Sequence, residues 1–193
     1  MSSAAPGKRV TLSAADWEHE ALEVIAEQGV RALAVESLAR RMGITKGSFY
    51  WHFASREALL DQALRLWEEH DARNLAASLG AINDPRERLI SFFRAASRER
   101  LTHRVYSALC AAGDHPSVEP LLERVAQRRM AQIAAAFGEL GFEASEAAHR
   151  ARLTYSAYLG FLQLQRQRQV PSLNSDDFEA YVEHVIATLI PVG

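Results

Sequence analysis

The sequence predicts an all-α protein of about nine helices. Apolar residues recur at helical spacing along most of the 193 residues, and the sequence contains neither an alternating strand pattern nor an internal repeat. The prolines, at positions 6, 85, 116, 120, 171 and 191, fall where that periodicity breaks, so each marks a helix boundary. With 48% hydrophobic and 24% charged residues, the composition is that of a globular chain, not of a disordered or fibrous one.

The first helix has clear start and stop signals. Ser13 is in position to cap it, and Asp16 three residues later completes a capping box, while Leu12 and Trp17 occupy the two positions of a hydrophobic staple. Gly29 supplies the terminator. The apolar stripe of this helix consists of Trp17, Ala21, Val24 and Ile25.

Two short helices and one long helix are expected next. The first short helix ends at Gly43, and Thr45 can cap the second, whose apolar side carries Phe49 and Phe53. Ser55 can cap the long helix. The first short helix has the apolar stripe Val35, Leu38, Ala39 and Met42, and the long helix has Leu59, Ala63, Leu66, Trp67 and His70 on one side.

The remaining helices follow a second strong start signal. Asp84 is an acidic cap, Pro85 takes the first helical position and Glu87 the third, ahead of an apolar stripe that begins at Leu89. Four further helices are expected over Thr102–Ala112, Ser117–Leu140, Ser145–Gln167 and Ser175–Leu189.

Several functional classes are disfavoured by the sequence. Cys110 is the single cysteine and cannot form an internal disulfide, which indicates a reducing cytoplasm. The uncharged stretch Leu153–Gln165 is far shorter than the roughly 20 residues of a membrane-spanning helix, and the first residues lack the apolar core of a signal peptide. We therefore expect a cytoplasmic protein without a membrane partner.

The charge distribution singles out one segment. The formal net charge is only −2, yet residues 40 to 56 contain Arg40, Arg41, Lys46 and Arg56 and no acidic residue. A local basic patch on a nearly neutral protein indicates a small, defined contact with an anionic partner.

That segment has the pattern of a helix-turn-helix. Gly43, Ile44 and Thr45 form a tight turn between two short helices, and the second helix could enter a DNA major groove by its N-terminus. Lys46 and Ser48 would then face base edges, Trp51 a thymine methyl or a sugar, and the other polar residues the phosphates. The alternatives are a hairpin that merely packs and a buried Trp51. The candidate DNA contacts are Thr45, Lys46, Gly47, Ser48, Tyr50, Trp51, His52, Ser55 and Arg56.

The motif Thr-Lys-Gly-Ser-Phe-Tyr-Trp-His-Phe at 45–53, followed by Ser-Arg-Glu-Ala-Leu-Leu at 55–60, resembles the N-terminal domain of TetR-family transcriptional repressors. The resemblance covers about Leu12 to Leu66 and departs at Ala34, where the family often has a capping Thr or Ser. It implies a DNA-binding domain at 1–54 and a ligand-binding and dimerisation domain at 55–193. It further implies a homodimer that binds an inverted-repeat operator in double-stranded DNA and is released by a small-molecule effector.

Aromatic and titratable residues in the C-terminal region suggest where an effector could bind. The long helix from Ser55 is expected to join the hairpin to the bundle, so an effector should touch its second half. These residues could equally belong to the core. Cys110 and His115 lack the spacing of a zinc site, so no metal is expected. The candidate ligand-binding residues are Trp67, His70, Tyr106, Cys110, Tyr155 and Tyr158.

The last two helices each carry a strongly apolar face. Such faces either complete the core or meet a second copy of the chain, and Gly160 could serve close packing in either case. The resemblance favours a dimer. The candidate interface residues are Ala157, Gly160, Phe161, Leu164, Val182, Val185, Ile186 and Leu189.

The favoured interpretation is a ligand-responsive, dimeric DNA-binding repressor. The alternative is a small-molecule-binding helical protein whose basic hairpin binds a protein partner or binds DNA without sequence preference. A Gly-rich phosphate loop and a paired-carboxylate motif are both missing from the sequence, so neither an enzyme nor a cofactor is expected.

Overall fold

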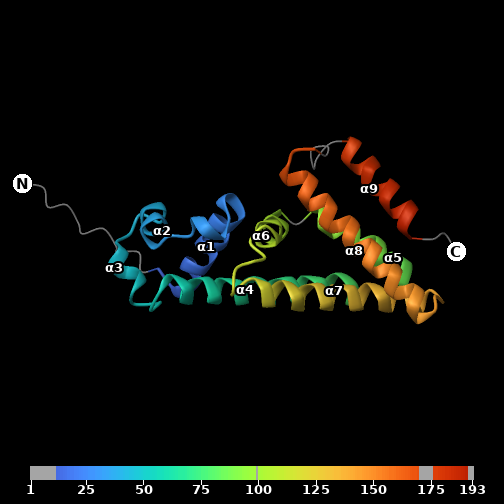
Figure 1. Cartoon of the computed structure of the whole chain (residues 1–193), viewed down its shortest axis with the longest axis horizontal. Helices are drawn as coiled ribbons and strands as arrows, with labels where there is room; N and C mark the ends of the chain where they lie inside the picture. The colour runs from blue at the N-terminus through green and yellow to red at the C-terminus, as the bar shows by residue number, and fades with distance from the viewer. Residues whose placement is uncertain (1–11, 99, 170–175, 191–193) are drawn as a thin grey trace, which may run out of the picture.

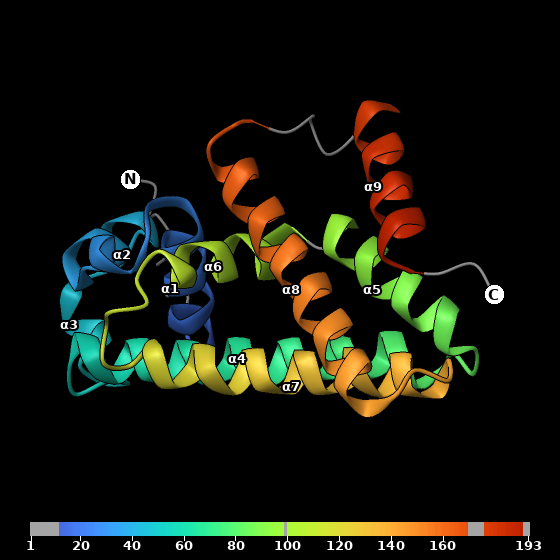
Figure 2. The ribbon, with the colours of Figure 1, turned by 45° about the vertical axis from the view of Figure 1, so that its right-hand side comes forward.

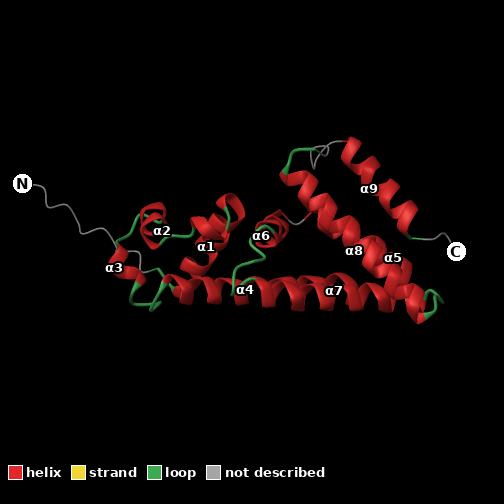
Figure 3. Cartoon of the chain, viewed as in Figure 1, coloured by secondary structure: helices red, strands yellow, loops and turns green. Residues whose placement is uncertain are grey.

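The computed structural model describes residues 12–98, 100–169 and 176–190. Within these residues the chain forms nine α-helices and one short 3-10 helix and has no strand, which confirms the predicted all-α class (Figure 3). The elements are α1 (Ala14–Gln28), η1 (Val30–Ala32), α2 (Val35–Arg41), α3 (Lys46–Phe49), α4 (Arg56–Gly80), α5 (Pro85–Arg98), α6 (Arg100–Cys110), α7 (Glu119–Glu139), α8 (Ala144–Arg166) and α9 (Asp176–Leu189).

The predicted signals at both ends of α1 are confirmed. The Ser13 hydroxyl accepts a hydrogen bond from the Asp16 amide, and the Asp16 carboxylate accepts one from the Ser13 amide at 2.7 Å. Gly29 ends the helix with a φ of 87°, a conformation that favours glycine. The apolar stripe headed by Trp17 is buried.

The turn between α2 and α3 has the predicted geometry with one difference. Gly43 has a φ of 69°, and Ala34, at the N-cap position of α2, makes no side-chain capping bond, both as expected. Thr45 occupies the N-cap position of α3, but its side chain makes no capping hydrogen bond, so the predicted cap is wrong. Phe49 of α3 is fully buried, with its ring centroid 5.3 Å from that of Trp17.

Helix α4 connects the two ends of the molecule. Helices α1, α2 and α3 lie at one end and α5, α8 and α9 at the other, and α4 runs beside α7 (Figures 1 and 2). The Ser55 hydroxyl accepts a hydrogen bond from the Ala58 amide at 3.1 Å, which confirms the predicted cap.

An ion-pair ladder joins α4 to α7. Arg124 donates to Glu68 at 2.8 Å, Arg128 donates to Asp71 at 3.1 Å, and Arg129 also donates to Asp71. The residue numbers of the paired residues increase in the same direction along both helices, so α4 and α7 run parallel. These ion pairs fix the register of the two helices.

The N-terminal helices contact the bundle at a second place besides α4. Helix α1 packs against α6 as well as against α4. An ion pair between Arg31 and Asp114, 3.4 Å apart, adds to this second junction. The start of α9 was expected at Ser175, which lies outside the described residues. No helix in the described ranges has the length and apolarity to cross a membrane.

Candidate nucleic-acid interface and ligand site

The residues predicted to contact DNA gather at one end of the molecule. Thr45, Lys46 and Gly47 are exposed at the start of α3, and Ser48 is half-buried. The alternative of a buried Trp51 is wrong, because its side chain is 88% exposed. The exposed residues that follow α3 are Tyr50, Trp51 and His52.

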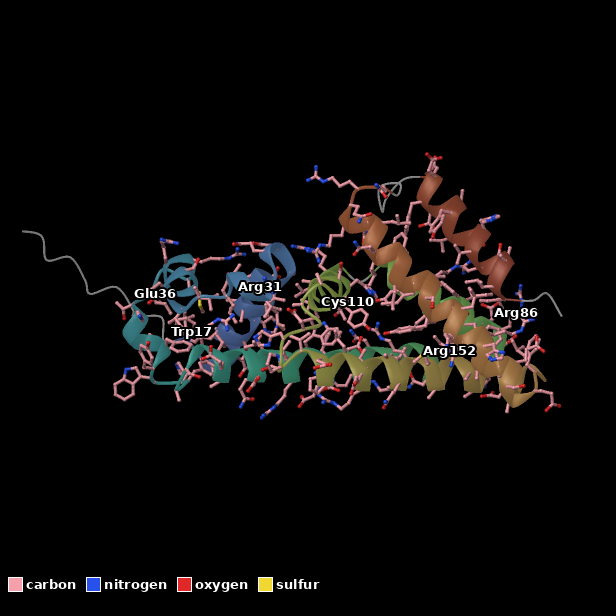
Figure 4. All side chains as sticks on the ribbon, in the orientation of Figure 1. Trp17, Arg31, Glu36, Arg86, Cys110 and Arg152 are labelled. Atoms are coloured by element: carbon pink, nitrogen blue, oxygen red, sulfur yellow. The ribbon has the colours of Figure 1, made fainter. Side chains whose placement is uncertain are left out.

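A rigid apolar base holds this surface in place. Phe49 packs against Trp17 of α1 and lies 5.5 Å from Phe53, centroid to centroid. Figure 4 shows Trp17 between α1 and α4, behind the exposed α3 surface. The one turn of α3 is thus fixed from behind while its outer side faces solvent.

Lys46 already has an anionic partner in the free protein. Its ammonium forms an ion pair with Glu36 of α2, which Figure 4 places at the same end of the molecule. The hydrogen bond from Lys46 lowers the pKa of Glu36, and the same bond raises the pKa of Lys46. The basic surface of α3 is therefore partly neutralised before any partner binds.

Arg41 serves the fold of this domain. Its guanidinium donates to both carboxylate oxygens of Glu27, at 2.5 and 2.9 Å, and also pairs with Glu20. The hydrogen bond from Arg41 lowers the pKa of Glu27. These bonds fasten α2 to α1, so Arg41 adds less to the basic patch than the sequence indicated.

The position of Arg56 corrects a predicted phosphate contact. Its Nε donates to the Leu33 carbonyl at 2.7 Å, its Nη2 to the Val30 carbonyl at 2.9 Å, and its Nη1 lies 3.3 Å from Glu57. All three nitrogens are engaged within the protein. Arg56 therefore ties the start of α4 to the segment ahead of α2.

Four of the predicted ligand-binding residues form an aromatic cluster in the bundle, namely Trp67, Tyr106, Tyr155 and Tyr158. The rings of Trp67 and Tyr106 stack with centroids 5.6 Å apart, and the hydroxyls of Tyr106 and Tyr155 are hydrogen-bonded. All four side chains are buried, and burial raises the pKa of Tyr106. The cluster is a packed part of the core, which is the alternative that the sequence left open.

The other two predicted ligand-binding residues differ in their relation to this cluster. His70 is exposed on α4, and its Nε2 lies 2.9 Å from the Asn74 side-chain amide. Cys110 is exposed at the end of α6 (Figure 4), and its thiol is hydrogen-bonded to Tyr106 at the edge of the cluster. Neither residue lines the cavity that α4, α5 and α7 form.

Sequence reasoning missed the two buried charges beside the aromatic cluster. Arg129 is only 3% exposed, and its guanidinium carbon lies 4.4 Å from the centroid of the Tyr106 ring. Asp71 is buried as well and is its ion-pair partner. The available signal was a charge inside an apolar stripe, since Arg129 lies between Val125 and Ile133 on one face of α7.

Two cavities are found among the described residues of the bundle, and the larger one lies away from the aromatic cluster. A cavity of about 310 Å³ is formed by α4, α5 and α7, and none of the four aromatic-cluster residues lines it. A second one of about 30 Å³ lies under α9, and Tyr158 lines it together with Phe161 and Phe178. The larger cavity touches α4 at Ala76, so the expected contact with the second half of this helix is present while the expected lining is not.

The predicted interface residues divide into two groups. Phe161, Val182 and Ile186 are buried within the chain, and the Phe161 ring lies 5.5 Å from that of Phe178, so these residues complete the core. Their expected interface position is wrong. Gly160 and Leu164 are exposed, and Ala157, Val185 and Leu189 are half-buried.

An exposed apolar stripe remains on α8, and one of its members, Leu153, was not among the predicted interface residues. Leu153 is 59% exposed and Leu164 is 38% exposed. Together with Ala157 and Gly160 they lie at spacings of four, three and four residues, on one face of the helix.

Helix α3 is exposed and rests on the buried rings of Phe49 and Trp17, and Gly43 forms the turn before it. Helix α4 then leads into a helical bundle. These features define a helix-turn-helix protein with a second helical domain. Residues 19–63 match the family described as "Bacterial regulatory proteins, tetR family". This segment of the chain therefore carries the N-terminal domain of the TetR family.

Curated relatives agree with this assignment. The HTH-type transcriptional repressor KstR2 of Mycobacterium tuberculosis is 36% identical over 83 residues, which are 43% of this chain and 41% of the relative. The class A tetracycline repressor protein of Escherichia coli is 33% identical over 128 residues, which are 66% of this chain and 55% of that protein. The matched segments thus span less than two thirds of these relatives.

Solved structures share the fold over nearly the whole chain. A regulator from Saccharomonospora viridis in complex with choline superposes with a TM-score of 0.74 at 19% identity and covers 91% of this chain and 92% of that one. A TetR regulator from Legionella pneumophila also gives a TM-score of 0.74, at 17% identity, and covers 95% of this chain and 100% of that one.

Proposed function

We propose that this protein is a sequence-specific, DNA-binding transcriptional repressor whose short helix α3 reads the major groove. The observation that carries the proposal is the α3 surface, where Lys46 and Trp51 are exposed while Phe49 of the same turn is fully buried. Such a helix has a fixed orientation and a free outer face, as base readout requires.

The side chains on this surface suit different parts of a DNA groove. Lys46 can donate to the guanine acceptors, and Ser48 can donate or accept at either kind of base pair. Trp51 offers a large apolar face to a thymine methyl or to a sugar. Tyr50 and His52 are exposed beside it and can donate to phosphate oxygens, which sets the position of the helix without specifying sequence.

The exposed stripe on α8 supports a homodimer. Leu153, Ala157, Gly160 and Leu164 form an apolar face with a glycine that permits a close approach of a second helix. A two-fold pair of chains would present two α3 helices in opposite orientations, so the operator would be an inverted repeat with half-sites about one helical turn apart.

The bundle would carry the response to a small-molecule effector. An effector changes DNA binding only if it binds two arrangements of the protein with different affinity. Both α4 and α6 reach the DNA-binding domain, so an effector that shifts either one could change the spacing of the two α3 helices. As a member of a family of bacterial regulators, the protein would act in the cytoplasm, where the DNA is.

Footprinting on a DNA library tests the proposal. We expect protection of a short palindromic site by two chains, with the Lys46→Ala variant retaining its fold but losing the footprint at the wild-type concentration. Salt-dependent protection without sequence preference would refute specific readout and would favour a helical binding protein whose basic surface has another partner.

A further inference from the structure

One acidic side chain lies beside the proposed DNA-reading surface. Between Glu27 and Glu57 the sequence has a single acidic residue, Glu36 of α2, and it was not among the predicted DNA contacts. Its side chain is 66% exposed and lies beside α3 at the outer end of the molecule (Figure 4). The phosphates of DNA repel a carboxylate, so an acidic residue here weakens any contact that depends on charge alone.

Glu36 and Lys46 form one donor–acceptor unit. The Lys46 ammonium donates to the Glu36 carboxylate, and both side chains are exposed. This bond lowers the pKa of Glu36, so its carboxylate is ionised at neutral pH and can only accept. An ammonium has three N–H groups and a carboxylate has two oxygens, so each keeps free hydrogen-bonding capacity. A base edge that Lys46 reaches is therefore within reach of Glu36 as well.

We propose that Glu36 and Lys46 together read one G·C base pair, with Lys46 on the guanine and Glu36 on the cytosine. In the major groove the O6 acceptor of guanine lies next to the N4 donor of cytosine, because these two atoms are hydrogen-bonded to each other. This spacing suits an ammonium and a carboxylate that are hydrogen-bonded as well. Glu36 is then a specificity-determining residue, an inference that rests on the proposed function.

The order of donor and acceptor decides which base pairs are accepted. The unit requires an acceptor facing Lys46 and a donor facing Glu36. With the base that faces Lys46 named first, T·A has the same order as G·C, but it offers a methyl group in place of the guanine N7 acceptor. The reversed pairs, C·G and A·T, place a donor against the ammonium and an acceptor against the carboxylate. We therefore expect G·C to be preferred, T·A to be second and both reversed pairs to be disfavoured.

Four matched DNA duplexes test this reading. They carry the selected operator and differ only, in both half-sites, at the base pair where Lys46→Ala loses its preference. In fluorescence anisotropy titrations at low salt, the wild type should bind the G·C duplex about tenfold or more tightly than the C·G duplex. Glu36→Gln should make this ratio at least about threefold smaller, because a glutamine amide can turn either to donate or to accept.

Glu57→Gln is the matched control. Glu57 is 65% exposed, lies in the first turn of α4 and has a cationic partner in Arg56. Each substitution removes one exposed negative charge from the same domain, but only Glu36→Gln should change the ranking of the four duplexes. Exposed ion pairs contribute little to stability, so both variants should keep the melting temperature of the wild type. An altered ranking at an unchanged melting temperature would show that Glu36 acts on base choice and not on the fold.

The outcomes separate this inference from the proposed function. If Glu36→Gln strengthens binding to all four duplexes equally, or if the preferred pair is not G·C, Glu36 does not read a base and the inference is overturned. Both results leave the proposed function intact, since the wild type still selects an operator. If the wild type selects no operator, the proposed function is refuted and this inference with it.

Discussion

Asp71 of α4 and Arg129 of α7 form a buried ion pair at the centre of the molecule. The guanidinium of Arg129 also lies over the rings of Tyr106 and Tyr158, at 4.4 and 5.3 Å from their centroids. One buried cation thus contacts residues of α4, α6 and α8. Since α4 and α6 also pack against α1, this pair joins two bundle helices that reach the DNA-binding domain.

Removal of Asp71 should be strongly destabilising. The Asp71→Ala variant leaves the Arg129 charge buried without its partner, and we expect it to lower the free energy of unfolding by roughly 3–5 kcal/mol. Urea denaturation followed by circular dichroism measures this change. Glu69→Ala is the control, because Glu69 is exposed and its ion pair with Arg73, at 3.8 Å, is exposed as well. A loss no larger than that of the control would contradict a structural role for the pair.

The ion-pair ladder should make stability depend on pH. The hydrogen bond from Arg124 lowers the pKa of Glu68 below its ordinary value of 4.5, in spite of partial burial. A carboxylate with a lowered folded-state pKa contributes stability above its unfolded pKa and loses it as the pH falls through the folded value. The difference in melting temperature between wild type and Glu68→Gln should therefore be full at neutral pH and shrink below about pH 4.5. A difference independent of pH would refute the assignment.

Arg56 should affect stability and DNA binding together. Arg56→Ala removes two hydrogen bonds to main-chain carbonyls, so we expect a lower melting temperature of the DNA-binding domain and weaker binding to all sequences. Arg56→Lys should not restore both bonds, because an ammonium cannot replace the planar fork of the guanidinium. Lys46→Ala provides the contrast and should leave the melting temperature unchanged. An unchanged melting temperature of Arg56→Ala would contradict the role of Arg56 in joining the start of α4 to Val30 and Leu33.

Glu36 should restrain DNA binding through Lys46. Glu36→Gln removes the anionic partner of this lysine, so the affinity for DNA should rise about two- to fivefold at low salt. The gain should disappear at high salt, because exposed charges are screened. Fluorescence anisotropy with labelled DNA at several salt concentrations measures it. If Glu36→Gln weakens binding at every salt concentration, Glu36 has another role.

The N-terminal domain could be predicted closely because its signals are local. The Ser13 capping box, the Gly29 and Gly43 turns and the Ser55 cap each depend on residues within one helical turn, and each was found as expected. The role of Arg56 could not be predicted in the same way. Its acceptors at Val30 and Leu33 lie 26 and 23 residues away in sequence.

The bundle was harder to predict because one apolar stripe can serve two purposes. On α8, Phe161 turns into the core while Leu164, three residues later, faces solvent, and the sequence assigned both to one interface. The buried charges were missed because charged residues normally lie on the surface. Only the packing of α4 against α7 shows that Asp71 and Arg129 are buried. Cavity positions depend on such packing and carry no local signal.

Selection of binding sites from random DNA, with wild type and Lys46→Ala in parallel, tests the central claim most directly. We predict that wild type selects an inverted repeat and that Lys46→Ala selects the same repeat with preference lost at one symmetric position in each half-site. Selection of a single asymmetric site, or an identical preference of both proteins at every position, would contradict the claim that two copies of α3 read the operator.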